Sequence, residues 1–544
     1  MTAEDFEASQ ERGFYSLLRL ARALGRRLAG APVDLTVLTN GLERVVAGEP
    51  LRPEKATLLG AVRVLPQEMP GVRCRAVDVV PAAAGSREEA RLVARLAAEV
   101  TGESGDEVLA YRGRQRWVQS FEPVRLPAVA ADDGGTEDGG GVPAPLRRRG
   151  VYLLTGGLVG NGYAVARFLA RAAGARLVLL EEAPVTARVE GGGEDARAAR
   201  VRQLEELGAE VLVLAADLAD PAAVGSAVDE AASRWGTLHG VVHTAGAVGE
   251  RNFQLLAETG GEECGWHFRP RIHGLLALEA ALAGRPGRPD PERPDFCLLL
   301  SSLATVLGGL AYGPYAASNQ FLDAFAEERS DRGGLPWRSV GWDVWELEGE
   351  EEQIAALSPE LAELAMTPQQ GEEALRRLLA ADAEAILVST GDLGARLAQR
   401  RARIAAHRGA AAGAPRAPGE RHPRPQLPTS YTTPETDLER RIVEVWEELL
   451  GFESIGAEDN FFELGGDSFV AVQVAARLHQ VLGVELPVAQ LYQGVTPRSL
   501  ARLLADGGAA RAERLAAHLE ERRQSADRRK DFLQKKRLQK IAGR

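Results

Sequence analysis

The stretch that most constrains the fold is residues 151–180, VYLLTGGLVGNGYAVARFLARAAGARLVLL. It contains an apolar strand, a glycine-rich turn, an amphipathic helix and a second apolar strand. Units of this kind build parallel sheets covered by helices. Glycine is needed where the turn passes close to a pyrophosphate, and the helix start presents free N–H groups to it. The pattern predicts a nucleotide-binding turn in an α/β domain, with a tight structural turn as the alternative.

Later strand ends are expected to complete the cofactor site. Strands are predicted at 210–220 and 238–248, with a helix at Pro221–Trp235 between them. Ligands of such sheets lie at the carboxyl ends of the strands. Asp217 is placed to contact an adenine, and His243–Gly246 forms a small-residue strand end near the cofactor. The predicted cofactor-binding residues from these segments are Thr155, Gly156, Gly157, Gly160, Gly162, Asp217, Leu218, Ala245 and Gly246.

Residues 296–326, FCLLLSSLATVLGGLAYGPYAASNQFLDAFA, suit carbonyl reduction. A buried strand leads to Ser302, Tyr315 follows thirteen positions later, and Asn319 lies one helical turn beyond Tyr315. Hydride arriving at a carbonyl carbon leaves charge on the oxygen, so the site needs a proton donor and a second hydrogen bond there. Tyr315 is the candidate acid and Ser302 the orienting donor, and a cation is needed to lower the pKa of Tyr315. The alternative is a strand end followed by an ordinary amphipathic helix.

Composition excludes several other classes of function. The chain has 544 residues, which indicates three or four domains, and a formal net charge of -12, which argues against general nucleic-acid binding. Its histidines are scattered and predict no metal site. Cys74, Cys264 and Cys297 are far apart in sequence and are expected to be reduced packing thiols. Without a membrane-spanning apolar run or a signal-like N-terminus, we expect a cytoplasmic protein with no membrane partner.

The segments around the nucleotide-binding unit predict further domains. Residues 1–130 alternate helices with β-rich runs but have no glycine-rich phosphate loop, which indicates a structural α/β half-domain. Residues 131–150 are rich in glycine, acidic residues and proline, as a linker would be. The nucleotide-binding domain is predicted at 150–400. Within it, 385–390 would close the sheet and the acidic segment 346–366 lies where a substrate-covering lid would be.

The C-terminal part is predicted to be helical. Residues 401–433 have a linker composition, and 434–506 contain three or four short helices with apolar faces, which predicts a small bundle. Ser468 stands at the start of its second main helix, where it could also serve as a helix cap. Residues 507–544 hold twelve Arg or Lys against five Asp or Glu. This tail is either a solvated charged helix or a helix that docks on an acidic partner.

Two parts of the chain resemble known families. The turn Thr155–Gly162, HTAG at 243–246 and the set Ser302, Tyr315 and Asn319 resemble a polyketide synthase-type ketoreductase of the short-chain dehydrogenase superfamily. This resemblance covers residues 1 to about 395 and is nearest to ketoreductases of hybrid peptide/polyketide assembly lines. FFELGGDSFVAVQV resembles the attachment motif of acyl and peptidyl carrier domains. The implied fold is two α/β Rossmann-like subdomains, the first truncated and structural and the second catalytic, followed by an all-α four-helix carrier bundle.

The resemblance also implies an activity and partners. It implies reduction of a ketoacyl thioester to a hydroxyacyl thioester with NADPH, and a 4′-phosphopantetheine arm on Ser468 that holds the substrate. The implied partners are a phosphopantetheinyl transferase and the condensing and loading enzymes of an assembly line, which the C-terminal tail could recruit. The acyl chain, the α- or β-keto position and the product stereochemistry stay open. The alternative is a non-catalytic scaffold whose degenerate reductase fold presents the carrier domain.

Two departures from the family affect its catalytic and cofactor residues. Arg271 stands where the family has a lysine in a Pro-Lys-x-x-Gly segment, so the resemblance makes Arg271 the catalytic cation, although the two side chains are not equivalent. After the second strand the family offers an arginine to the 2′-phosphate of NADPH, whereas this chain has Glu181 and Glu182. Glu182 would repel that phosphate and could accept a ribose hydroxyl, which makes NADH possible unless Arg176 or Arg188 compensates. Both carboxylates could also be solvated loop charges.

Overall fold

The computed structural model divides the chain into two compact units, Met1–Arg416 and Ala417–Arg544. It describes residues 1–27, 32–69, 71–102, 105–127, 145–186, 195–246, 254–283, 293–330, 334–346, 363–381, 385–412, 422–425, 427, 429–461, 463–464, 466, 468–482, 491 and 494–505. Within these ranges no helix is long and apolar enough to cross a membrane, and no three His, Cys, Asp or Glu side chains gather as a metal site. The three cysteines are buried and free, as predicted.

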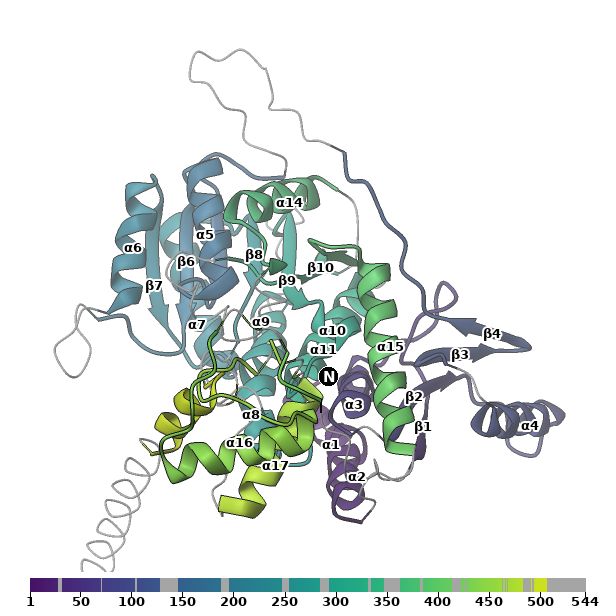
Figure 1. Ribbon diagram of the computed structural model, residues 1–544. Coiled ribbons are helices and arrows are strands. Elements are labelled where there is room, and N and C mark those ends of the chain that lie inside the picture. Colours follow the sequence, from purple (N-terminus) through teal and green to yellow (C-terminus); the bar gives the residue numbers. More distant parts are fainter. Residues whose placement is uncertain are drawn as a thin grey trace, which may run out of the picture. The chain divides into compact units, whose positions relative to one another are not determined.

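The first sheet of the larger unit has the strand order β1-β2-β3-β4 (Figure 1). Strands β1 to β3 are parallel, and β4 pairs antiparallel with β3 at the sheet edge. This short sheet agrees with the predicted truncated subdomain. Its helices and strands are α1 (Ala3–Arg12), α2 (Phe14–Arg27), β1 (Val33–Thr39), α3 (Pro53–Glu68), β2 (Val72–Val79), α4 (Arg87–Thr101), β3 (Val108–Arg112) and β4 (Gln115–Val118).

The second sheet has seven parallel strands in the order β11-β10-β9-β8-β5-β6-β7. The chain runs outward from β5 in both directions, so the switch point lies beside β5, where the ligands of such sheets bind. The elements are β5 (Val151–Thr155), α5 (Gly160–Ala173), β6 (Arg176–Glu181), α6 (Ala196–Glu206), β7 (Glu210–Ala215), α7 (Pro221–Trp235), β8 (Gly240–His243), α8 (Gly261–Phe268), η2 (Arg269–His273), α9 (Gly274–Ala283), β9 (Phe296–Ser302), α10 (Ala304–Leu307), α11 (Gly313–Ser330), β10 (Trp337–Trp342), α14 (Pro368–Ala380), β11 (Ala385–Val388) and α15 (Leu393–Ala412).

Helix α3 connects the N-terminal part of the unit to the second sheet, because it packs along α11. A Cβ atom on Gly60 would lie only 2.4 Å from the backbone nitrogen of Ala317, so glycine allows the two helix backbones to touch. Most residues of α3 are buried, on all faces of the helix. A helix without a polar face lacks the 3.6-residue periodicity that reveals amphipathic helices, which explains why the sequence pattern did not indicate it.

The linker predicted at 401–433 is shorter in the structure. Helix α15 continues to Ala412, and Arg408 of this helix forms an ion pair of 2.7 Å with Asp34. At the other end of the predicted linker, Arg424 forms an ion pair of 2.6 Å with the buried Asp459 of the smaller unit. A linker composition therefore did not prevent packing at either end, because arginines there pair with an exposed carboxylate, Asp34, and a buried one, Asp459.

The smaller unit contains α16 (Asp437–Leu450), α17 (Ser468–Leu482) and helical residues 497–505. Thr436 and Glu439 form a capping box at the start of α16, in which each side chain accepts the other's backbone N–H. The rings of Trp446 and Phe461 lie 4.9 Å apart between centroids and build its core. The helical nature of this unit agrees with the prediction. The predicted docking tail and most of the predicted lid lie outside the described residues.

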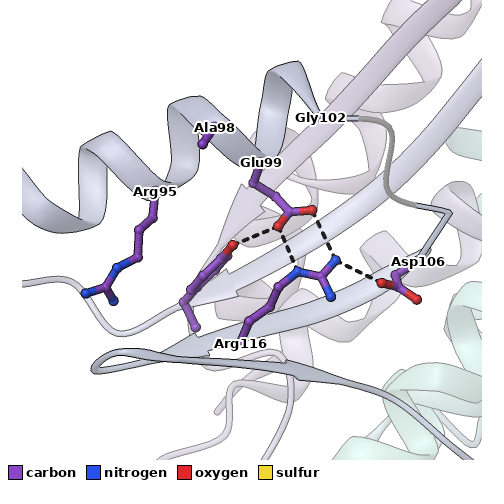
Figure 2. A pocket seen from close by; sticks show the side chains of 7 residues that line it. Arg95, Ala98, Glu99, Gly102, Asp106 and Arg116 are labelled. Carbon is purple, nitrogen blue, oxygen red and sulfur yellow. Dashed lines mark hydrogen bonds and ion pairs between the residues drawn. The ribbon is translucent and has the colours of Figure 1, made fainter.

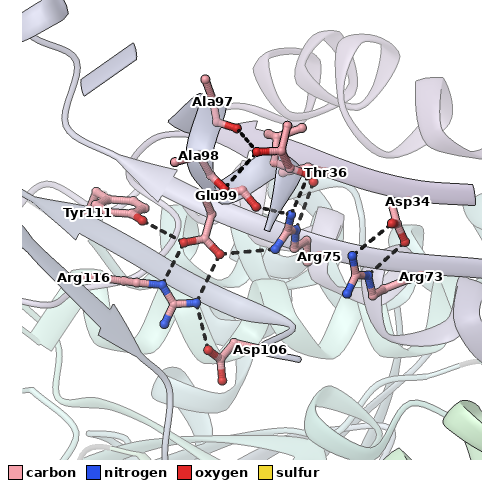
Figure 3. A network of polar contacts seen from close by, with 12 residues as sticks. Asp34, Thr36, Arg73, Arg75, Ala97, Ala98, Glu99, Asp106, Tyr111 and Arg116 are labelled. Carbon is pink, nitrogen blue, oxygen red and sulfur yellow. Dashed lines mark hydrogen bonds and ion pairs between the residues drawn. The ribbon is translucent and has the colours of Figure 1, made fainter. Parts of the chain in front are cut away.

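A polar network stabilises the N-terminal sheet around Glu99 of α4 (Figure 3). The carboxylate accepts hydrogen bonds from Arg116 Nε at 2.8 Å, Tyr111 Oη at 2.7 Å and Arg75 Nη1 at 3.2 Å. The hydrogen bonds from Arg116 hold the pKa of Glu99 below its ordinary value. Glu99, Tyr111 and Arg116 also line a pocket of about 460 Å³ between α4 and the strands (Figure 2). Because Glu99, Arg116 and Asp106 pair with one another, the pocket walls are charge-compensated, and none of the predicted site residues lines it.

Glu99→Gln should lower the free energy of unfolding by about 2 kcal/mol, because two arginines lose part of a buried charged partner. Thermal unfolding of the full chain, followed by tryptophan fluorescence, measures the change. An unfolding transition identical to that of the wild type would contradict this prediction.

Candidate active site and carrier serine

Four glycines shape the turn between β5 and α5. Gly156 and Gly160 have φ angles of 72° and 50°, in the left-handed region that glycine adopts without steric cost. A Cβ on Gly162 would lie 2.2 Å from the carbonyl oxygen of Gly156, and one on Gly157 would lie 2.8 Å from a leucine of β6. Val159, before α5, makes no side-chain cap to the first N–H groups of that helix. The turn and the open helix start fit the pyrophosphate of a dinucleotide.

The carboxylate that ends β6, Glu181, turns toward this glycine turn. Glu181 is buried, and its Oε1 accepts a hydrogen bond from the backbone nitrogen of Leu158 at 3.1 Å. Burial raises the pKa of Glu181, while N–H groups of Leu158 and Gly157 act to lower it. The interpretation of Glu181 as a solvated loop charge is therefore wrong, because it supports the turn. Glu182 is exposed, and its contact with a ribose hydroxyl stays a prediction.

Two arginines of α6 lie beside the turn and the loop after β6. Arg200 Nη1 donates to the carbonyl oxygen of Leu158 at 2.7 Å, and its guanidinium lies 5.0 Å from the ring centroid of Tyr163. Arg197 donates to the carbonyl oxygens of Ala183 at 3.2 Å and Pro184 at 3.0 Å. Arg197 also forms an ion pair of 2.9 Å with the buried Asp195, which compensates its charge. The guanidinium of Arg200 lies beside the glycine turn itself, on the side where the adenosine end of a dinucleotide binds in such folds.

Of the two arginines proposed from sequence to compensate for Glu182, only Arg176 lies within the described residues. Arg176 is the first residue of β6 and lies 3.5 Å from Glu210. It is therefore at the end of the strand opposite the glycine turn, and the suggestion that it compensates is wrong. Arg188 lies outside the described residues.

His243 links the glycine turn to Arg271. It ends β8 and is 1% exposed, with Nε2 2.8 Å from the carbonyl oxygen of Arg271 and Nδ1 2.8 Å from Thr155 Oγ1. A carbonyl oxygen can only accept, so Nε2 carries the proton and Nδ1 accepts from the Thr155 hydroxyl. Burial lowers the pKa of His243 to about 4, which keeps the ring neutral near pH 7. From the sequence, His243 is expected near the cofactor, but its hydrogen bond to Arg271 is not.

His243 should make the larger unit sensitive to acid. Its pKa is about 4 in the fold and 6.5 as the ordinary value, so the unfolded chain binds more protons between these pH values. The free energy of unfolding should therefore fall as the pH drops through this window, by about 2 kcal/mol at about pH 4.5. His243→Gln should flatten this dependence. Thermal unfolding at a series of pH values tests it, and parallel pH profiles for the two proteins would contradict it.

The predicted catalytic hydroxyls come from two elements that contact each other, β9 and α11. Ser302 ends β9, and its Oγ accepts a hydrogen bond from the backbone nitrogen of Ala304 at 3.1 Å. Tyr315 lies in the first turn of α11, and both Ser302 and Tyr315 are half-buried. Asn319 is buried, and its Nδ2 donates to the carbonyl oxygen of Tyr315 at 2.9 Å. Asn319 thus fixes the helix backbone at Tyr315, and its part in a proton relay stays a prediction.

Arg271 provides the cation expected near Tyr315. Its guanidinium carbon lies 4.8 Å from the centroid of the Tyr315 ring, and its Nη1 lies 3.3 Å from Nδ1 of His267. The residue is part of η2, a π-helical turn of the kind often found at functional sites. Burial lowers the pKa of Arg271, while its interaction with Tyr315 acts to raise it. Residues far apart in the sequence therefore form one charged and aromatic site.

Of the remaining predicted cofactor residues, Gly246, Ala245 and Leu218 are packed into the site region, whereas Asp217 is exposed. Gly246 gives Arg271 room, since a Cβ there would lie 2.4 Å from Arg271 Nη2, and the N–H of buried Ala245 donates to Thr155 Oγ1 at 3.4 Å. Leu218 is buried. Asp217 is exposed and forms an ion pair with Arg269, so its contact with an adenine stays a prediction.

Ser468, the predicted attachment residue, is the first residue of α17. A Cβ on Gly466 would lie 2.5 Å from the carbonyl oxygen of Phe461, so the turn before the helix requires glycine. The structure thus places the serine at a helix start, and the rest of the GGDS turn and the Ser468 side chain lie outside what it describes.

Two family models match the chain. The model described as "KR domain" matches residues 150–347, and the one described as "Phosphopantetheine attachment site" matches residues 440–504. The first range includes the glycine turn, Arg271, Ser302, Tyr315 and Asn319, and the second includes Ser468.

Known polyketide synthase proteins and solved ketoreductase structures are also similar to this chain. A phenolphthiocerol/phthiocerol polyketide synthase protein of Mycobacterium tuberculosis (strain CDC 1551 / Oshkosh) is 30% identical over 375 residues, which is 68% of this chain and 18% of that protein. An A1-type ketoreductase structure is 27% identical with a TM-score of 0.56, covering 73% of this chain and 78% of that one. A structure with the adenylation, ketoreductase and pseudo-Asub domains of a keto acid-selecting NRPS module has a TM-score of 0.61 at 23% identity, over 74% of this chain and 31% of that one. The chain therefore spans less than a fifth of the mycobacterial relative.

Proposed function

Because this chain contains a KR domain and a phosphopantetheine-attachment domain of the kind found in polyketide synthases, we propose that it reduces a ketoacyl thioester held on its own carrier domain. The product is the hydroxyacyl thioester. The observation that carries the proposal is the guanidinium of Arg271 at 4.8 Å from the ring of Tyr315, in the same sheet-edge region as the glycine turn. This pairing favours the reductase over a scaffold, because it places the expected cation at the candidate acid.

A bound nicotinamide cofactor would supply the hydride. Gly156, Gly160 and the start of α5 hold its pyrophosphate. Tyr315 donates its phenolic proton to the carbonyl oxygen as negative charge develops there, and Ser302 Oγ donates a hydrogen bond to the same oxygen. The positive charge of Arg271 favours the tyrosinate that this transfer leaves. Asn319 keeps the backbone of Tyr315 in place and takes part in returning a proton to it.

NADPH is the cofactor that the loop after β6 favours. Arg197 lies at this loop as an ion pair with Asp195, and Arg200 lies beside the neighbouring glycine turn. Guanidinium groups at these two places suit a 2′-phosphate. Glu181 is engaged with the glycine turn, so Glu182 is the carboxylate that opposes the phosphate. NADH is the second candidate because of Glu182.

The carrier domain supplies the substrate. Ser468 receives the 4′-phosphopantetheine arm from a phosphopantetheinyl transferase, and the arm's thiol holds the acyl chain. Tethering gives the thioester a high effective concentration at the reductase. Condensing and loading enzymes of an assembly line provide that acyl chain, and the basic residues 507–544 are a docking segment for such a protein. A β-ketoacyl group is the first candidate substrate, and the keto acid-selecting module among the similar structures supports an α-keto group as the second.

Intact-mass analysis of the full chain tests the function. Ser468 is converted to its pantetheinylated form with a β-ketoacyl or an α-ketoacyl group, and NADPH or NADH is added separately. We expect a gain of two hydrogens with NADPH. A loaded protein that gains no hydrogens with either cofactor or either substrate would contradict the reductase proposal and leave a carrier scaffold.

A further inference from the structure

Glu68, the last residue of α3, holds two loops that lead to the catalytic residues. It is 7% exposed, its Oε2 accepts a hydrogen bond from the backbone nitrogen of Leu256 at 2.7 Å, and its Oε1 accepts one from Ala311 at 3.1 Å. Leu256 precedes α8, and Ala311 lies between Ser302 and Tyr315. A single carboxyl group from the N-terminal part of the unit therefore joins segments from both sides of the active site.

The loop before α11 depends on this end of α3. Gln67, next to Glu68, donates from Nε2 to the carbonyl oxygen of Leu307 at 3.0 Å. Ala311 has a φ angle of 62°, a left-handed conformation that costs a non-glycine residue free energy and persists only where its surroundings hold it. Its neighbour Tyr312 packs against Tyr315 with ring centroids 5.6 Å apart. The hydrogen bond from Ala311 to Glu68 thus fixes the backbone directly beside an aromatic partner of Tyr315.

The loop before α8 is held in the same way. Arg22 of α2 donates from Nε to the carbonyl oxygen of Ala257 at 3.0 Å, and it also donates to those of Glu258 and Thr259. Leu256 is fully buried, and a Cβ on Gly313 would lie 2.2 Å from the Leu256 side chain. This loop therefore packs closely against the start of α11. The loop continues into α8, whose His267 ring lies 6.0 Å from the ring of Tyr315.

Two aromatic neighbours of Tyr315, Tyr312 and His267, thus lie in segments whose preceding loop residues are hydrogen-bonded to Glu68. We propose that Glu68 is a positioning residue for the reduction: by holding the N–H groups of Leu256 and Ala311, it sets where Tyr312 and His267 stand around Tyr315. This inference rests on the proposed reductase function. Arg22 supports one of the two loops and contributes less.

The environment of Glu68 favours a role in geometry over a role in stability. Burial raises the pKa of its carboxyl group to about 8, the nearby Glu258 raises it further, and the two N–H bonds act to lower it. A buried carboxyl group whose pKa is raised in this way adds little to the free energy of unfolding. Its two bonds to loop backbones are what the side chain contributes.

Glu68→Gln in the full chain tests the inference. The amide keeps the size of the side chain but offers one oxygen for two N–H groups. We expect kcat/KM for a diffusible ketoacyl thioester to fall about 10-fold, with the Kd for NADPH within about 2-fold of wild type. Hydrogen exchange followed by mass spectrometry should show faster exchange in peptides covering 254–260 and 308–312. Arg22→Gln should raise exchange in the first peptide alone, and Glu99→Gln, a buried carboxylate elsewhere in the N-terminal part, should change neither exchange nor kcat/KM.

The outcomes separate the inference from the proposed function. Wild-type protein that reduces no thioester would overturn the reductase function, and the inference with it. With an active wild type, the inference is overturned if Glu68→Gln keeps wild-type kcat/KM, if its activity falls without faster exchange in the two peptides, or if Glu99→Gln loses as much activity. Should Glu68→Gln not fold, two other measurements decide. Wild-type protein with unprotected amides at 256 and 311 would overturn the inference. So would an Arg22→Gln variant that exchanges faster at 254–260 but keeps full activity.

Discussion

Replacing Tyr315 with phenylalanine is expected to lower kcat for thioester reduction by about 1,000-fold, within the range usual for a general acid. The variant removes only the hydroxyl oxygen. The ring that faces the Arg271 guanidinium at 4.8 Å and Tyr312 at 5.6 Å stays, so the fold and the cofactor site should persist. Single-turnover reduction of the loaded carrier measures the rate, and fluorescence titration measures the Kd for NADPH.

Tyr111→Phe is the matched control. It removes the tyrosine hydroxyl that donates to Glu99 in the N-terminal sheet, where no predicted catalytic residue lies. This control should keep the wild-type rate and lower the thermal stability slightly. If Tyr315→Phe reduced the thioester within about 10-fold of the wild-type rate, another group would have to be the acid.

Gly162→Ala is expected to weaken nicotinamide cofactor binding by about 100-fold. The added Cβ would lie 2.2 Å from the carbonyl oxygen of Gly156 and 2.4 Å from Thr244 Oγ1, so α5 has to move away from the turn. Overpacking of this kind costs about 1–3 kcal/mol, and each 1.4 kcal/mol is a factor of ten in affinity. Because the start of α5 faces the pyrophosphate, much of this cost should appear as a weaker Kd, measured by titration with NADPH and with NADH.

Gly225→Ala separates this effect from a general change in a helix. Gly225 lies within α7 of the same sheet, and a Cβ there would meet nothing within 4 Å. Its replacement should leave the Kd unchanged and stabilise the helix by about 0.5–1 kcal/mol. A Gly162→Ala variant with the Kd of Gly225→Ala would contradict the role of the close approach.

Local patterns in the sequence predicted the elements of the second sheet. The predicted helix at 221–235 coincides with α7, and the apolar runs at 151, 176, 210, 240 and 296 begin or contain strands, because buried parallel strands are continuously apolar. The glycine turn was also predictable, since each glycine there is required by a local backbone conformation or a close contact. Helix α3 was not, because its burial on nearly every face leaves no periodicity.

The side chains around the end of β6 were predicted less well from the sequence. The alternative of solvated loop charges covered both Glu181 and Glu182, whereas Glu181 is buried and accepts a hydrogen bond from the turn. The sequence analysis named Arg176, which is at the far end of its strand, as a compensating charge. Arg197 at the loop after β6 and Arg200 at the glycine turn, both placed by the packing of α6, were not predicted. Side chains on one strand alternate direction and strands pair across long separations, so such contacts depend on the sheet order.

By itself, the sequence predicted the glycine turn and the candidate pair Ser302 and Tyr315, because each depends on residue types at short spacing. It also made Ser468 the candidate attachment residue, through the resemblance of its surrounding motif to carrier domains. Only the tertiary structure decided which side chains surround Tyr315. Arg271 reaches its ring through a π-helical turn tied to His243, and Glu68 binds the two loops beside it across 188 and 243 positions of sequence. Hydrogen bonds over such separations form only when α3, β8 and α11 pack together, and no local pattern encodes that packing.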